Sequence, residues 1–321
     1  MKYDDMRLAC IRGYEWPAEL ISLTEVLDTL AGVLDINTLR KLIDTYSKSE
    51  DIVVTLVTKE YLGVAKLWLS MLSLVEVKQY IVIAGDVETG LFLDSMNVPN
   101  CKVILKNHDD KKNKFTSPTG FTEKGLAISV LKFPFVKLLV ELGYNVLLID
   151  IDALLLMKPS AEYFENADVA FQRIVYFPPQ IAEIWGFAAC GGCFWFRANK
   201  KAIGFINKVI DIQRITYDDQ IALNVALWES NIQWDISGGN EQYISFNNEI
   251  EDTKSYFKDQ SAKTFDGIIE AQGMNIRALS PALFWRNDIV PLDLSKVVIF
   301  HPNSPKTEAG KLEVFKKYGF S

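Results

Sequence analysis

The 321-residue chain has few of the residues that mark several large protein classes. It contains only two histidines and four cysteines, too few for a disulfide framework. It has no Asn-x-Ser/Thr acceptor sequence, and its first ten residues lack the apolar core of a signal peptide. The most membrane-like run, from Val146 to Met157, is interrupted by two aspartates, whereas a bilayer span needs about 20 apolar residues. We therefore expect a reducing, cytoplasmic setting and no transmembrane segment.

An excess of basic residues is also missing. The chain carries 34 Lys and Arg against 41 Asp and Glu, a formal net charge of -7. Binding to a nucleic-acid backbone needs a concentrated basic surface, so nucleic acid is excluded as the main partner. Hydrophobic residues make up 49% of the chain, which is usual for a globular protein of this length.

Residues 1–48 are predicted to form a helical extension that precedes a domain spanning residues 49–321. Apolar residues from Ala18 to Leu30 recur with a period close to 3.6, and a second helical run ends near Tyr46. The extension could be a packing appendage, or it could bind an acceptor or a second copy of the chain.

From Asp51 onward, strand-like and helix-like segments alternate. Strands are predicted at 52–57, 80–83, 102–105, 145–149, 168–172, 193–197, 277–279 and 297–300. Helices are predicted at 61–74, 89–96, 121–142, 200–215 and 218–228. Residues 230–275 are polar and are predicted to be rich in loops. This order favours an α/β fold with a mixed, mostly parallel sheet flanked by helices.

Two aspartates directly follow the most strand-like run of the chain. Asn145 to Ile149 has the character of a buried strand and leads into Asp150 and Asp152, spaced i, i+2. In extended backbone this spacing points both side chains to the same side. Ligands of open α/β sheets bind beyond the carboxyl ends of the strands, and two carboxylates there repel each other unless a cation joins them. The pair is a candidate site for Mg²⁺ or Mn²⁺, or else two solvated aspartates at a strand end.

A glycine pair lies between two cysteines at Cys190, Gly191, Gly192 and Cys193, immediately before the strand predicted at 193–197. Glycines in that place let the backbone turn closely under a ligand. The cysteine spacing also suits a redox pair or a zinc site. However, a redox pair has its first cysteine at a helix N-terminus, and structural zinc needs four ligands. We therefore predict that both cysteines pack in the core.

Two further polar segments stand beside predicted elements. Asp218, Asp219 and Gln220 open a predicted helix, where Asp218 alone suits an N-cap. Near the end of the chain, a short apolar strand is followed at once by His301, with Lys306 five residues later. A lone histidine after a strand is either structural or a ligand.

Taken in order, six segments resemble the nucleotide-diphospho-sugar transferase family of GT-A fold, especially its retaining branch that includes plant cell-wall α-xylosyltransferases. The lipopolysaccharide galactosyltransferases are more distant. The resemblance runs from about Asp51 to Lys306. Its motifs are a strand followed by Thr58 and Tyr61, then Lys132, GYNVLLIDIDALLLMKP, CGGCFWFR, DDQIALNVAL and VIFHPNSPK. It implies a metal-dependent glycosyltransferase that moves a sugar, with retention, from a nucleotide-sugar donor such as a UDP-sugar. The acceptor would be a glycan, a protein or a small molecule.

The resemblance also assigns roles to single residues. Asp150, Asp152 and His301 would hold Mn²⁺ or Mg²⁺ as the cofactor. Donor-binding roles fall on Thr58 and Tyr61 at the base and ribose, Lys132 at the phosphates or sugar, Gly192 at the sugar, and Lys306 at the diphosphate. Asp219 and Gln220 would lie near the anomeric carbon as catalytic residues.

The implied chemistry follows from the leaving group. A nucleoside diphosphate gains negative charge as its bond to the sugar breaks, and a divalent cation and Lys306 would stabilise that charge. Retention would follow either front-face attack within an ion pair, which we favour, or double displacement through Asp219. We expect an exposed metal site, in which Asp152→Ala abolishes transfer but leaves the fold intact.

Two other functions remain open. A haloacid-dehalogenase-like phosphatase also carries Asp-x-Asp after a buried strand, but on its first strand and with Thr or Val where this chain has Leu154. A non-catalytic protein that binds a nucleotide sugar is the second alternative, which donor turnover would exclude.

Overall fold

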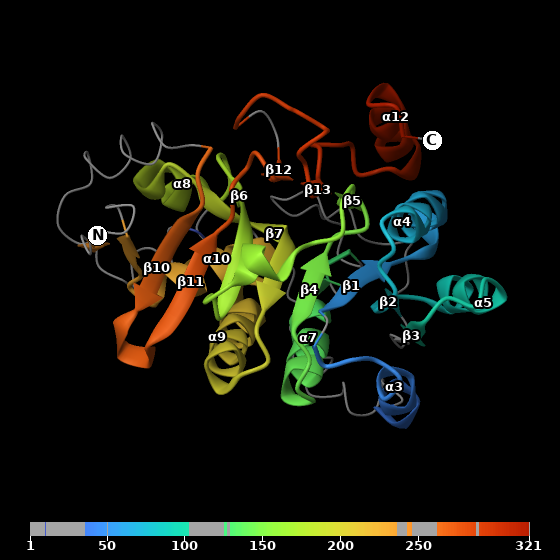
Figure 1. Ribbon diagram of the computed structural model, residues 1–321, viewed down its shortest axis with the longest axis horizontal. Coiled ribbons are helices and arrows are strands. Elements are labelled where there is room, and N and C mark those ends of the chain that lie inside the picture. The colour runs from blue at the N-terminus through green and yellow to red at the C-terminus, as the bar shows by residue number, and fades with distance from the viewer. Residues whose placement is uncertain are drawn as a thin grey trace.

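In the computed structural model, the chain folds around one large mixed sheet (Figure 1). The structure describes residue 10 and residues 36–49, 51–102, 125–126, 129–235, 243–245, 262–286 and 289–320. The strands of this sheet are β1 (Ile52–Val57), β2 (Tyr80–Ala84), β3 (Asn100–Lys102), β4 (Val146–Ile149), β6 (Val169–Ile174), β7 (Ala188–Phe196), β8 (Gln233–Asp235), β9 (Tyr243–Ser245), β10 (Phe265–Ile269) and β11 (Met274–Ala278). Among the described residues their order is β3-β2-β1-β4-β7-β6-β11-β10-β8-β9.

One half of the sheet is parallel. β3, β2, β1 and β4 run side by side in the same direction. The connections include a short 3₁₀ turn, η2 (Lys59–Tyr61), and the helices α4 (Leu62–Leu74), α5 (Val87–Ser95) and α7 (Lys132–Glu141). Both faces of these strands are covered, which explains their nearly continuous β-branched and aliphatic sequences. The predicted alternation of strands and helices is confirmed here.

The other half begins where the strand direction reverses. β7 runs antiparallel to both β4 and β6, and β11 then pairs in parallel with β6. The remaining neighbours, β10, β8 and β9, alternate in direction. The connecting elements are η3 (Ala161–Phe164), α8 (Pro179–Trp185), α9 (Lys200–Thr216), α10 (Asp219–Glu229) and η4 (Glu270–Gln272). The prediction of a loop-rich segment at 230–275 is wrong for its described part, which supplies three strands and the first two residues of a fourth.

A small second sheet lies above the carboxyl end of β4. It contains β5 (Leu154–Leu155), β12 (Phe284–Trp285) and β13 (Ile299–Phe300), in the order β12-β13-β5. The chain then continues into α12 (Glu308–Lys317), which was not predicted. Its apolar contacts are few, mainly Phe315 in the core, so its sequence carries little helical periodicity.

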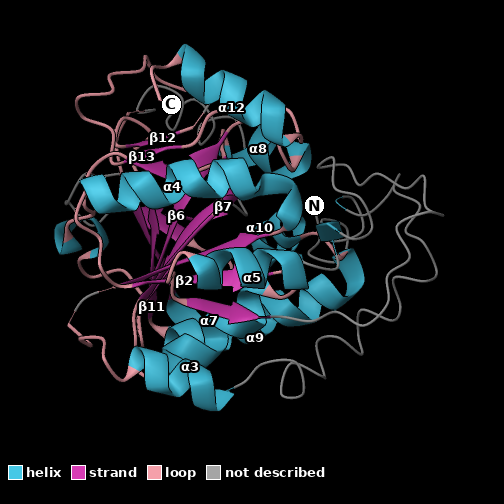
Figure 2. Ribbon diagram, turned by 90° about the vertical axis from the view of Figure 1, so that its right-hand side faces the viewer, coloured by secondary structure: helices cyan, strands magenta, loops and turns pink. Residues whose placement is uncertain are grey.

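Two helical layers enclose the sheet (Figure 2). One layer contains α7, α9 and α10, whose buried residues share a core with one face of the sheet. The other contains α4, α12 and the small sheet, which pack on the opposite face. Within the described residues, no helix combines the length and the apolar composition needed to cross a bilayer.

The described part of the N-terminal segment is attached to this body. In α3 (Ile36–Ile43), Leu39 and Ile43 are buried in the same core as α7. The Tyr144 hydroxyl donates a hydrogen bond to the Ile43 carbonyl oxygen at 2.8 Å. The helix predicted at Ala18 to Leu30 lies outside the described residues, and the boundary at residue 48 stays a prediction.

A proline and a glycine mark the two ends of α7. The long helix predicted at 121–142 is described as α7, with Pro134 in its first turn, where a proline is tolerated. Gly143 ends it with φ of 92°. The strand predicted at 102–105 is described only to Lys102, and its remainder lies outside the described residues.

One buried amide ties α10 to β7. Asn224 Oδ1 accepts a hydrogen bond from the Ala189 backbone N–H, and its Nδ2 donates to the Ala189 and Gln220 carbonyl oxygens, each at 2.8 Å. Asn224 is fully buried. It therefore fixes the start of β7 against the helix behind it.

We predict that Asn224→Ala lowers the free energy of unfolding by about 2–4 kcal/mol, because both polar groups of a buried peptide unit lose their partner. Thermal or denaturant unfolding would measure the loss. Asn207→Ala, on the partly exposed side of α9, is the matched control and should change stability little. Equal stability of the two variants would contradict the assignment.

Candidate active site

The three predicted metal ligands come together above the carboxyl end of β4. Asp150 follows β4 directly, and a tight turn, closed by the Ala153 N–H and the Asp150 carbonyl oxygen at 2.9 Å, leads through Asp152. β5 then pairs antiparallel with β13, with Leu154 opposite Phe300. This register places His301 beside Asp152. One ligand atom from each of Asp150, Asp152 and His301 lies within 4.8 Å of the other two.

The glycine pair lies inside a strand rather than before it, which corrects the prediction. β6 and β7 pair regularly up to Phe171, but the register then jumps, so that Cys190 to Cys193 stand opposite Gln172 alone. The bulge carries Gly192 toward the site, where its carbonyl oxygen accepts a hydrogen bond from the Asp150 N–H at 2.9 Å. A Cβ on Gly192 would lie 2.5 Å from Asp150 Oδ2 and still closer to His301 Cε1. Only glycine fits this position.

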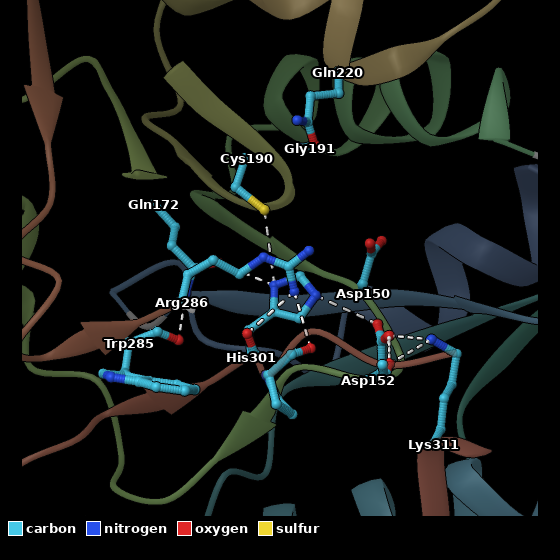
Figure 3. Close-up of polar contacts among 12 residues, drawn as sticks. Asp150, Asp152, Gln172, Cys190, Gly191, Gln220, Trp285, Arg286, His301 and Lys311 are labelled. Atoms are coloured by element: carbon cyan, nitrogen blue, oxygen red, sulfur yellow. Dashed lines mark hydrogen bonds and ion pairs between the residues drawn. The ribbon is translucent and has the colours of Figure 1, made fainter. Parts of the chain in front are cut away.

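The orientation of His301 is set by residues that the sequence did not single out. Its Nδ1 lies 3.0 Å from Gln172 Oε1, and Gln172 Nε2 donates to the Trp285 carbonyl oxygen at 3.1 Å. Because the Gln172 oxygen is an acceptor, Nδ1 of His301 carries the proton. Nε2 then faces Asp152 Oδ1 at 3.5 Å (Figure 3).

An imidazole lone pair and a carboxylate oxygen that face each other repel unless a cation lies with them. A proton or a metal ion can fill that role. Burial and the charge of Arg286 lower the pKa of His301, while Cys190 and Asp152 raise it, and the net shift is upward. Two carboxylates and an imidazole are also a suitable ligand set for a divalent ion, with Gln172 orienting the imidazole as outer-shell partners of ligating histidines do. The residues fit the expected metal.

Lys132 joins two carboxylates. Its ammonium lies 2.7 Å from Asp150 Oδ1 and 2.7 Å from Asp219 Oδ2. Burial lowers the pKa of Lys132, but the two carboxylates outweigh burial and raise it. Burial likewise opposes ionisation of Asp150, yet mainly the charge of Lys132 leaves its pKa below the usual value. Lys132 thus links Asp219, predicted to lie at the anomeric carbon, to the metal cluster.

Asp152 has a second cationic partner, Lys311, from α12. The Lys311 ammonium contacts Asp152 Oδ2 and donates to Ser304 Oγ at 3.1 Å, while the Ser304 hydroxyl donates to the same carboxylate oxygen at 3.1 Å. Burial would raise the pKa of Asp152, but Lys311 and His301 hold it well below its usual range. Sequence reasoning missed Lys311 because only the fold of α12 brings it to Asp152.

The site is more enclosed than expected. Asp152 is 7% exposed, His301 2% and Lys311 4%. The expectation of an exposed metal site is therefore wrong for Asp152 and His301, and we now expect Asp152→Ala to destabilise the fold, because it would leave the buried Lys311 ammonium without its carboxylate.

Gln220 has both ends of its amide bound to backbone. Its Oε1 accepts from the Gly191 N–H at 3.0 Å and its Nε2 donates to the Phe177 carbonyl oxygen at 2.8 Å. It therefore holds the β7 bulge against the segment that follows β6. Asp218 is the N-cap of α10, as predicted, and accepts from the Ile221 N–H at 2.9 Å.

The remaining predicted donor residues lie on two segments, one directly after β1 and one directly before α12. Thr58 is buried directly after β1, and Tyr61 follows it in η2. The Tyr61 hydroxyl donates to the Lys306 carbonyl oxygen at 2.7 Å, and the Lys311 ammonium lies 5.7 Å from the centroid of the Tyr61 ring. The structure therefore brings Tyr61 and Lys306 together beside Lys311. The family resemblance assigns these two residues to different parts of the donor, Tyr61 to the base and ribose and Lys306 to the diphosphate.

The two cysteines beside the glycines are buried free thiols, as predicted. Cys190 Sγ lies 3.8 Å from His301 Nδ1, so this cysteine packs behind the histidine. Among the described residues, the only group that could hold a metal is that of Asp150, Asp152 and His301.

Parts of the chain are similar to known glycosyltransferases. Arabinosyltransferase RRA2 of Arabidopsis thaliana is 28% identical over 131 residues, which cover 41% of this chain and 29% of that protein, less than a third of its length. Two structures of the galactosyltransferase LgtC, one in complex with donor and acceptor sugar analogs and one of an active-site mutant, are 10% and 11% identical. Each covers 54% of this chain and 69% of the LgtC chain, with TM-scores of 0.35 and 0.37.

A family model gives the decisive match. The model described as nucleotide-diphospho-sugar transferase matches residues 75–315, which is well over half of the chain and includes Lys132, all three candidate metal ligands and Lys311. The chain therefore belongs to the nucleotide-diphospho-sugar transferase family.

Proposed function

We propose that this protein is a metal-dependent glycosyltransferase that moves a sugar from a UDP-sugar to an acceptor with retention of configuration. The observation that carries the proposal is the cluster of Asp150, Asp152 and His301, in which one ligand atom of each residue lies within 4.8 Å of the other two. Family membership supplies the donor class. Membership of this family also argues against the alternative of a haloacid-dehalogenase-like phosphatase.

The ligand set favours Mn²⁺ as the cofactor. Carboxylate oxygens suit both Mg²⁺ and Mn²⁺, but Mg²⁺ prefers oxygen ligands alone, so the imidazole of His301 favours Mn²⁺. The chemistry that such a bound cation supplies is stabilisation of the negative charge that develops on the leaving diphosphate.

The protein's own groups position the reacting sugar. Asp219 is buried and ion-paired with Lys132, and a Cβ on Gly191 would lie 3.2 Å from its Oδ1. A carboxylate held by an ammonium group is a weak nucleophile, which supports front-face attack over double displacement. In that mechanism Asp219 would stabilise positive charge on the sugar, while Gln220 keeps the bulge in place.

The nucleotide would lie toward β1, where Thr58 and Tyr61 follow the strand and Lys306 is hydrogen-bonded to Tyr61. The acceptor, whether glycan, protein or small molecule, would approach from beyond the β7 bulge. The four cysteines are buried thiols, which supports a reducing, cytoplasmic setting.

We predict that Asp152→Asn lowers turnover at least about 100-fold at saturating Mn²⁺, since the amide keeps the shape of the carboxylate but loses its charge toward the cation. The measurement is release of UDP from a panel of UDP-sugars across a Mn²⁺ titration. Asp266→Asn, in a surface pair with Arg277, is the matched control and should keep normal turnover.

Normal turnover and an unchanged Mn²⁺ titration in Asp152→Asn would show that the metal assignment is wrong. A wild-type protein that binds UDP yet hydrolyses and transfers no nucleotide sugar would support the non-catalytic alternative instead.

We also predict that Gly192→Ala lowers turnover at least about 100-fold, because the added methyl group pushes Asp150 and His301 apart and small displacements of reacting groups carry such losses. Gly204→Ala is the control: no atom lies within 4 Å of its added Cβ, so it should add about 0.5–1 kcal/mol of stability without changing turnover. Full activity of Gly192→Ala would refute the close packing at the bulge.

A further inference from the structure

Lys311 is a buried cation that the reaction outlined above does not use. It is 4% exposed, and its ammonium is bound to Asp152 Oδ2 and Ser304 Oγ. An ammonium group has three donors, so one N–H remains beyond these two partners within the described part of the chain. Figure 3 shows Asp152 between Lys311 on one side and His301 on the other.

The position of Lys311 is fixed by contacts at the start of α12. Thr307 caps this helix, accepting a hydrogen bond from the Gly310 N–H at 3.2 Å. Glu308 accepts a hydrogen bond from the Gly63 N–H in the first turn of α4. Phe315, one turn beyond Lys311, is buried in the core below. Lys311 is therefore a fixed charge at the site and not a mobile surface lysine.

The charges around the metal ligands are nearly balanced without a metal. The carboxylates of Asp150, Asp152 and Asp219 face the ammonium groups of Lys132 and Lys311, and Lys306 and Arg286 also act on Asp152 or its neighbours. A divalent ion that entered alone would add two positive charges to an enclosed site with few counter-charges left. A divalent ion that enters with a diphosphate brings its own negative charge.

We propose that Lys311 is an internal counter-cation of Asp152 that makes binding of the divalent ion depend on binding of the nucleoside diphosphate. This inference rests on the proposed function. The Lys311 ammonium is ion-paired with Asp152 Oδ2, so the other carboxylate oxygen, Oδ1, faces His301 Nε2. The repulsion between the Lys311 ammonium and a divalent ion weakens binding of the bare ion. A diphosphate that binds beside Tyr61 offsets this repulsion, since the ammonium lies 5.7 Å from the centroid of the Tyr61 ring. Ion and diphosphate then bind cooperatively.

The test measures Mn²⁺ binding rather than activity. The dissociation constant of Mn²⁺ is determined for the full chain, by the electron paramagnetic resonance signal of free Mn²⁺, with and without saturating UDP. In the wild type we expect weak binding of Mn²⁺ alone and much tighter binding with UDP. In Lys311→Met we expect Mn²⁺ alone to bind roughly tenfold tighter, the size of effect that a charge within about 4–6 Å has on another ionic equilibrium. The enhancement by UDP should shrink by at least the same factor.

Two further variants complete the design. Lys316→Met removes a lysine from the exposed side of the same helix and should behave like the wild type. Lys311→Arg keeps the charge and should retain most of the dependence on UDP. Thermal unfolding of each variant would show whether it is folded, and if Lys311→Met is not, the wild type and Lys311→Arg still provide the test.

Weaker binding of Mn²⁺ alone to folded Lys311→Met would overturn the proposal, because Lys311 would then only hold Asp152 in position. Tight wild-type binding of Mn²⁺ without UDP would overturn it as well. In both cases the proposed function survives. Absence of Mn²⁺ binding to the wild type even with UDP would instead refute the metal centre, and this inference with it.

Discussion

The structure of the site depends on how it compensates three carboxylates that lie close together. Asp150 and Asp152 follow one buried strand, and Asp219 begins a helix that packs behind the neighbouring strand. Each of these carboxylates is at least partly enclosed, so each needs a cation to remain ionised. Lys132 serves two of them and Lys311 the third. The acceptors that still face each other, at His301 and Asp152, mark where a further cation belongs.

The backbone had to depart from regular geometry to build this arrangement. The β6–β7 ladder is interrupted between Phe171 and Arg173. The four-residue bulge at Cys190 to Cys193 presents the bare backbone of Gly192 to Asp150 and His301. Bulges of this kind redirect groups next to functional sites. Here Gln220 and Asn224 of α10 hold the bulge through backbone hydrogen bonds, so helix and strand form one unit.

The sequence predicts the parts of this site that are local and fails where distant segments meet. Asp150 and Asp152 were evident because a strand and its terminal pair lie within eight residues, and His301 because it follows a short apolar strand. The two glycines were singled out, but their place within β7 was not, since an interrupted ladder has no signature in one strand alone. Gln172 and Lys311 carry no local signal. Gln172 is one of two polar residues in an otherwise apolar strand, and Lys311 lies on a helix whose apolar periodicity is too weak to predict the helix.

The two lysines reach the carboxylates from opposite sides of the sheet. Lys132 begins α7, which packs in one helical layer, and Lys311 lies on α12, which packs in the other. The geometry at Asp150 and Asp152 therefore depends on the packing of both layers. A change that shifts α12 against α4, through Glu308 and Gly63, would move Lys311 and so alter the charge at Asp152 without touching any metal ligand. The C-terminal helix is for this reason part of the candidate site, although it lies outside every motif that the sequence offers.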